Sequence, residues 1–131
     1  MIRLGIALAL LTGLASAQSL DFQVYRTKVE PIFVKKRMGH ARCVACHSAS
    51  NGRFRLQWTQ GSAEFTEEQS HKNFELVSKL VTPGDPAKSA LCTHPLANDA
   101  GGDIFHSGGR QFTSQNDPDW KAMADWIRAA K

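Results

Sequence analysis

The sequence predicts a mainly α fold, a small bundle of about four helices. Segment 19–36 carries apolar residues at three- and four-residue spacing, which is the period of a helix with one buried face, and 64–80 is a second helical segment with Phe65, Phe74, Leu76, Val77 and Leu80 as its apolar positions. Asp-Pro pairs at 85–86 and 117–118 each place a capping carboxylate before a proline suited to the first helical position. The alternating stretch 51–60 resembles an extended strand, but no partner strand is visible, so no sheet is expected.

The first helix is expected over 19–36, with Ser19 or Asp21 as its N-cap. Its apolar stripe consists of Phe22, Tyr25, Val29, Ile32 and Phe33. Pro31 lies inside this stripe. Because proline has no N–H and clashes with the preceding turn, it should kink the helix or start a second short turn. Gly39 is expected to end the helical segment.

Three further helical segments follow in the sequence, separated by loops. A turn running into a short helix is expected at 43–48, a longer helix at 64–80, and a short helix from 85 to 91. Residues 93–116 are rich in Gly, Asn, Asp and Ser, and a loop of this length is usually functional or disordered. The last helix should begin at 117–118, with a buried face made of Trp120, Met123, Ala124 and Ile127.

The first 17 residues have the features of a secretory signal peptide. Arg3 gives a positive start, 4–14 is almost continuously apolar, and 15–17 reads Ala-Ser-Ala, a cleavage site of the A-x-A type. The apolar run is shorter than the roughly 20 residues that a membrane-spanning helix needs. We therefore expect cleavage to leave one domain, 18–131, in the periplasm or outside the cell, with no later membrane span; an uncleaved anchor is the alternative.

The densest chemical motif is Cys43-Val44-Ala45-Cys46-His47. Its C-x-x-C-H spacing is the attachment signature of c-type haem. The two-residue gap lets the thiols of Cys43 and Cys46 each add across one haem vinyl group, and the adjacent His47 then lies beneath the iron as its proximal axial ligand. The motif predicts one covalently bound haem c, which would also supply apolar interior to a chain of only 131 residues.

These cysteines could instead serve a zinc site, a redox pair or a disulfide. A structural zinc ion needs four ligands, which here would require Cys92 together with His47, His40 or His94. A thioredoxin-like pair should follow a strand in a βαβ pattern, which is not visible. A plain disulfide would give His47 no role.

The mature chain resembles the single-domain, single-haem class I-like cytochromes c of exported bacterial proteins. Residues 29–33 resemble the helix that leads into the haem motif, 81–91 resemble a V-x-P-G-D-P-x-x-S-x-L segment, and 120–127 resemble the closing helix. The resemblance implies a small bundle wrapped around one covalently attached haem, with a long Gly-rich distal loop. The chain departs from the family pattern at 101–109, where many members carry a Met-Pro-Pro whose methionine completes the iron.

The second axial ligand is therefore expected to be a histidine. His106 is the first choice, because the glycine pairs around it would let the backbone approach a flat ligand closely. His94 is the alternative, and an open or water-bound iron is the third possibility. The remaining candidates have other expected roles, since they lie too close to the attachment site, on a packed helix face or in a solvated stretch: Met38, His40, Met123 and His71.

Electron transfer is the function that these features predict, with a His/His-ligated iron of lower potential than a His/Met one. No catalytic constellation is visible, so the chain is not expected to be an enzyme. The net charge of +4 is too small to indicate nucleic acid, and the basic cluster 35–37 is either a solvated helix end or a patch for an acidic redox partner protein. Two other functions stay open: a haem-based binder or sensor of a small gas, and a non-haem protein with zinc or a disulfide.

Two single residues complete the expectations. Cys92 follows Leu91 and is expected to be a buried free thiol, with an intermolecular disulfide as the alternative. Arg110 lies close to His106 in the sequence. It could pair with a haem propionate, or it could be an ordinary surface arginine.

Overall fold

The computed structural model describes residues 18–49 and 51–131. The expected signal peptide, 1–17, lies outside the described residues. Within them the fold is mainly helical, as predicted, and the only β pairing is an isolated bridge between Leu96 and Phe112. The elements in chain order are α1 (Phe22–Val24), η1 (Tyr25–Val29), α2 (Glu30–Val34), α3 (Cys43–His47), α4 (Glu67–Ser78), η2 (Pro86–Lys88), α5 (Ala90–Thr93), η3 (Asn98–Ala100) and α6 (Pro118–Arg128).

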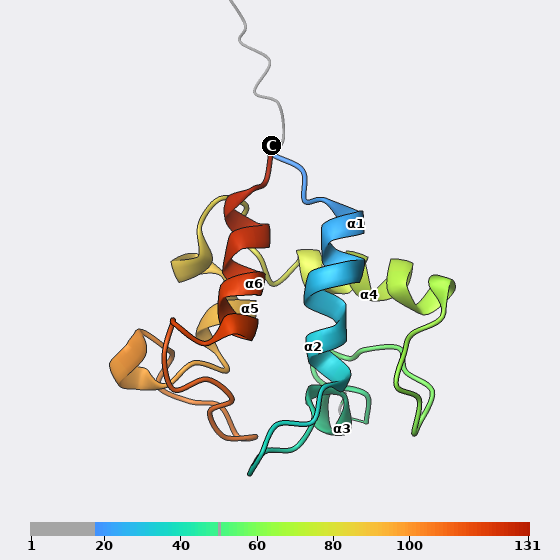
Figure 1. Ribbon diagram of the computed structural model, residues 1–131, viewed down its shortest axis with the longest axis horizontal. Coiled ribbons are helices and arrows are strands. Elements are labelled where there is room, and N and C mark those ends of the chain that lie inside the picture. Colours follow the sequence, from blue (N-terminus) through green and yellow to red (C-terminus); the bar gives the residue numbers. More distant parts are fainter. Residues whose placement is uncertain (1–17, 50) are drawn as a thin grey trace, which may run out of the picture.

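The first three elements form one helical rod with a wide turn in its middle (Figure 1). Asp21 caps the rod, since its side chain accepts a hydrogen bond from the N–H of Val24 at 2.9 Å. η1 is a π-helical turn, in which the Glu30 N–H bonds to the carbonyl of Tyr25. A normal α-helical pattern resumes in α2 with Pro31 in its first turn, where the missing N–H costs least. The expected second start near Pro31 is thus confirmed, and the rod ends at Val34.

The two longer helices, α4 and α6, begin at capping side chains. Thr66 and Gln69 form a reciprocal capping box at the start of α4, and Asp117 accepts from two backbone amides at the start of α6. The helix expected from 85 to 91 is divided instead. Ser89 adopts an extended conformation between η2 and α5, and its buried hydroxyl donates to the Asp85 carbonyl at 2.7 Å.

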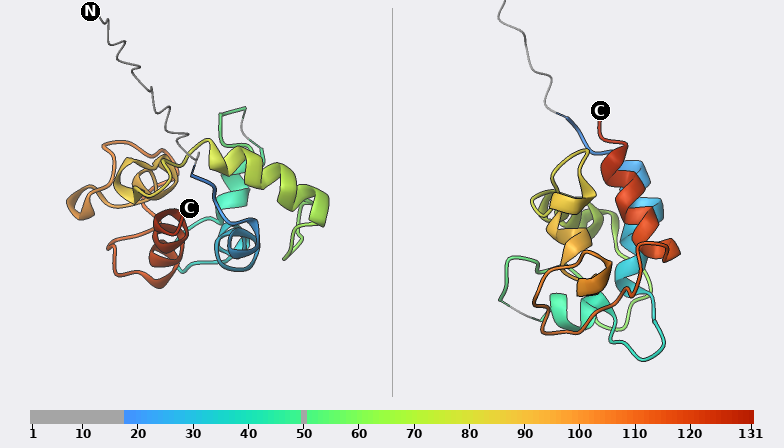
Figure 2. Two further views of the ribbon diagram at one scale, coloured as in Figure 1. Left: turned by 90° about the horizontal axis from the view of Figure 1, so that it is seen from above. Right: turned by 90° about the vertical axis from the view of Figure 1, so that its left-hand side faces the viewer.

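The core lies where α6 packs along the first rod. Tyr25 and Trp126 have ring centroids 5.6 Å apart, and the indole N–H of Trp126 donates to the Asp21 carbonyl at 2.8 Å. At the end of this pair, Ser19 and Lys131 exchange two backbone hydrogen bonds of 2.5 and 3.1 Å, so the two ends of the described chain lie side by side (Figures 1 and 2). The expected buried face of α6 is confirmed, and Trp126 joins it.

Two long irregular segments surround the helices. The alternating stretch 51–60 forms no strand within the described part of the chain, although Leu56 is buried and Asn73 of α4 bonds the backbone of Gln57 in both directions. Residues 93–116 form the expected loop, interrupted only by η3 and the isolated bridge. None of the helices in the described ranges combines the length and the apolar character that crossing a membrane requires.

Candidate functional site

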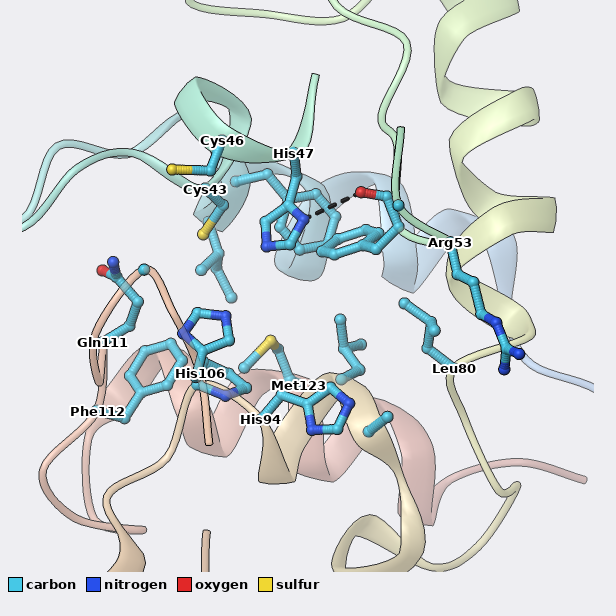
Figure 3. A pocket seen from close by; sticks show the side chains of 18 of the residues that line it. Cys43, Cys46, His47, Arg53, Leu80, His94, His106, Gln111, Phe112 and Met123 are labelled. Atoms are coloured by element: carbon cyan, nitrogen blue, oxygen red, sulfur yellow. Dashed lines mark hydrogen bonds between the residues drawn. The ribbon is translucent and has the colours of Figure 1, made fainter. Parts of the chain in front are cut away.

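A cavity of about 660 Å³ opens between α3, α2, α5 and the loop that carries His106. Its size lies within the range of about 300–1,000 Å³ typical of cofactor and small-molecule sites. Figure 3 shows its walls: α3 with Cys43, Cys46 and His47 on one side, and His106 on the other. The remaining lining includes the apolar side chains of Ile32, Phe33, Leu80, Val81, Leu91, Phe112 and Met123.

The motif residues reach the cavity because they share one face of α3. Cys43, Cys46 and His47 stand at i, i+3 and i+4, positions that lie together on a helix. Cys43 is largely buried, and burial raises the pKa of its thiol to about 11, while Cys46 is exposed at the cavity mouth. Both thiols, like that of Cys92, are free of disulfide bonds. The cavity therefore has two thiols beside an imidazole.

His47 presents one nitrogen to the cavity and uses the other to fix its ring. Its Nδ1 lies 3.0 Å from the carbonyl oxygen of Phe54. Burial lowers the pKa of His47, which favours the neutral imidazole; the nearby His106 and His94 act in the same direction. A neutral ring that donates from Nδ1 keeps the lone pair on Nε2, the nitrogen that binds metals.

His106 mirrors this arrangement from the opposite wall. Its Nδ1 lies 2.6 Å from the carbonyl oxygen of Gly109, so its Nε2 is likewise left for another partner. The two imidazole ring centroids are 6.1 Å apart and their planes differ by 31°. Segments separated by almost sixty positions in the sequence are thus brought into opposition (Figure 3).

The other candidate ligands are placed differently. His94 lines the cavity, but its Nδ1 is paired with the Asp103 carboxylate and its side chain is 55% exposed. His71 stacks on Phe22, with centroids 4.2 Å apart, and Met38 is 96% exposed. Met123 is buried on α6, as expected, and also contributes to the cavity wall. The geometry favours His106 over His94 as the partner of His47.

Sequence reasoning missed the cationic residues at the cavity. Four basic side chains line it, a set suited to anionic groups on a ligand: Arg42, Arg53, Lys79 and Lys88. They come from four separate segments, so no spacing in the sequence predicts that they lie together. Arg110 is not among the lining residues. Its guanidinium instead bonds groups within the loop, as described below.

The grouping of potential metal ligands is a further feature of the site. Among the residues that the structure describes, no three His, Cys, Asp or Glu side chains are grouped so that they could hold a metal ion. A structural zinc site needs four such ligands. Haem iron needs only two ligands from the protein, because the macrocycle supplies the others.

Comparison of the chain with protein-family models, curated proteins and solved structures found no significant match.

Proposed function

We propose that this chain is an exported, single-haem c-type cytochrome that transfers electrons between partner proteins. One observation carries the proposal: two imidazoles, each with Nδ1 held by a backbone carbonyl, face each other beside the two thiols of a C-x-x-C-H motif. In this proposal Cys43 and Cys46 form the thioether bonds, His47 is the proximal ligand and His106 the distal one.

The residues fit the proposed group in size, shape and chemistry. Two imidazole nitrogens that bind one iron from opposite sides at about 2 Å each bring their ring centroids to roughly 6 Å. The observed separation of 6.1 Å agrees with that value. The apolar lining suits a porphyrin face, and the basic side chains at the cavity, among them Arg42 and Arg53, suit its carboxylates.

When bound, haem supplies a reversible one-electron couple. The chain's own residues would do the rest. Phe54 and Gly109 orient the two imidazoles through their carbonyls, which keeps both ligands in place in either oxidation state. The buried Phe33, Phe112 and Met123 exclude water from the interior. Because a His/His pair lacks the methionine that raises the potential, a comparatively low reduction potential is expected.

Expression in a host that matures c-type cytochromes tests the proposal. We expect the mature polypeptide to gain the mass of one haem, to keep its colour after acid extraction, and to give a low-spin spectrum. The matched control is the double variant Cys43→Ala/Cys46→Ala, which should carry no covalent haem. The bare polypeptide mass with both thiols free would contradict the proposal.

The same preparation separates electron transfer from small-gas binding. A reduced spectrum that carbon monoxide leaves unchanged supports a six-coordinate electron carrier. Rapid formation of a carbonyl adduct would instead support a gas binder with an open distal position. A colourless protein that retains zinc would support the non-haem alternative.

A further inference from the structure

Arg110 occupies the base of the loop that carries His106. It is half-buried, and its guanidinium bonds three groups. Nη1 donates to the His94 carbonyl at 2.7 Å, while Nη2 donates to the Asn98 side-chain oxygen at 2.5 Å and to the carbonyl of Asp103. The planar fork of an arginine is suited to several acceptors held in fixed directions.

These contacts close the loop on itself. Asp103 and Arg110 lie on either side of His106, so the bond from Arg110 to the Asp103 carbonyl joins the two ends of the segment 103–110. His94 and Asn98 belong to the preceding turn, which the Asp103 N–H also contacts through the Thr93 carbonyl at 3.0 Å. The guanidinium therefore ties the two ends of the loop to the turn on which the loop rests.

The tip of the loop has little other support. Ile104 and Phe105, directly before His106, are 92% and 77% exposed, and a Cβ on Gly109 would meet nothing within 4 Å. Apolar packing therefore does little to hold the imidazole of His106 in position. Its Nδ1 is hydrogen-bonded to the Gly109 carbonyl, and its ring lies opposite that of His47 across the cavity.

We propose that Arg110 is a positioning residue that holds the loop closed and thereby keeps His106 opposite His47. This inference rests on the proposed function and deepens it. An external ligand can take the distal position only when the loop is open, so its apparent affinity scales with the open fraction. Hydrogen bonds from a charged group are among the stronger ones. Losing three of them should raise the open fraction, and hence that affinity, about tenfold or more.

The test measures imidazole and cyanide binding to the oxidised holoprotein, with amide hydrogen exchange of the 103–110 peptide as a second readout. Arg110→Gln should bind both ligands at least tenfold more tightly than the unaltered protein and exchange faster in this peptide alone. Arg110→Lys should behave similarly, because one ammonium cannot reproduce the planar fork. The control Arg128→Gln, which removes an exposed pairing with Asp125 on α6, should change neither readout.

A milder pair of variants keeps the test usable if Arg110→Gln folds poorly. Asn98→Ala removes one acceptor and should give a smaller rise in ligand affinity and in exchange of the 103–110 peptide. Asn98→Asp retains an acceptor oxygen and should show the affinity and exchange of the unaltered protein. Unchanged ligand affinity and exchange in Arg110→Gln, with a low-spin haem present, would overturn this inference alone. Absence of covalent haem from the unaltered protein would overturn the proposed function, while the exchange measurement would still report on the loop.

Discussion

His47 and His106 face each other across the cavity with ring centroids 6.1 Å apart, each ring fixed through Nδ1 by a backbone carbonyl. His47 follows from a motif that is contiguous in the sequence. His106 comes from a loop, and only the folding of that loop brings it opposite His47.

Replacing His106 with Ala should convert a low-spin iron to a high-spin one, because the imidazole that faces His47 would be lost. The reduced variant should then bind carbon monoxide readily. The measurement is the visible spectrum before and after addition of the gas. His94→Ala is the control and should stay low-spin, since His94 is paired with Asp103. The opposite result, with only His94→Ala turning high-spin, would show that the ligand was misassigned.

Met123→Leu should leave the spectrum low-spin, because Met123 is proposed to pack in the cavity wall and not to bind the iron. A swap of similar volume should cost less than about 1.5 kcal/mol of unfolding free energy. Met123→Ala should cost about 2–5 kcal/mol, since it leaves a void beneath the buried face of α6. Denaturant unfolding gives both values. A change of spin state in the Leu variant would identify methionine as the ligand.

Gly102→Ala should destabilise the loop base severely. A Cβ at this position would lie 1.8 Å from the backbone oxygen of Leu96 and 2.9 Å from that of Ala97, so the backbone must move. We expect a loss of about 3 kcal/mol in unfolding free energy. Gly61→Ala is the control: it has a positive φ of 84° but no atom within 4 Å, and should cost about 1–2 kcal/mol from backbone strain alone. Equal losses in the two variants would contradict the predicted clash.

Glu30→Gln should change the pH dependence of stability. Glu30 is 5% exposed; Ser70 donates to one of its oxygens at 2.7 Å, and the other has no hydrogen-bond partner among the described residues. Burial raises the pKa of this carboxyl, with the hydrogen bond from Ser70 and the charge of Arg26 acting in the opposite direction. Its folded pKa thus exceeds the unfolded value of about 4.3, so its contribution to stability is full below that pH and is lost as the pH rises through the folded pKa.

The Gln variant cannot ionise, so its stability should decline less as the pH rises above about 4.3, with a gain on the order of 1 kcal/mol once the carboxyl of the unaltered protein is ionised. Urea unfolding at several pH values measures this effect. Glu68→Gln, which removes an exposed carboxylate paired with Lys72, should leave the decline in place. A Gln variant whose stability falls as steeply as that of the unaltered protein would count against the buried carboxyl as the cause.

Local signals in the sequence predicted most of the helical framework. Asp21 and Asp117 each begin a helix because a side-chain oxygen accepts from the first free amides, an effect that needs no tertiary information. The division of the helix at Ser89 was not predicted. Its buried hydroxyl bonds the backbone of Thr82, seven positions earlier, and of Asp85, and these bonds hold Ser89 in an extended conformation.

The candidate site also contains residues that the sequence predicted and residues that it did not. Cys43, Cys46 and His47 share a helix face, so their spacing alone brings them together. The role of Arg110 was open to two readings, and only the folded loop shows that its guanidinium bonds His94, Asn98 and Asp103. The cationic residues at the cavity come from separate segments, and no short pattern in the sequence predicts that these segments lie close together.

The backbone pairing of Ser19 with Lys131 has a practical consequence. The two ends of the described part of the chain lie together at the end of the molecule remote from α3, as Figures 1 and 2 show. A tether, fusion partner or electrode linker attached at either end would therefore leave the mouth near Cys46 unobstructed. Immobilised through its termini, the molecule would present its proposed redox edge outward to whatever docks there.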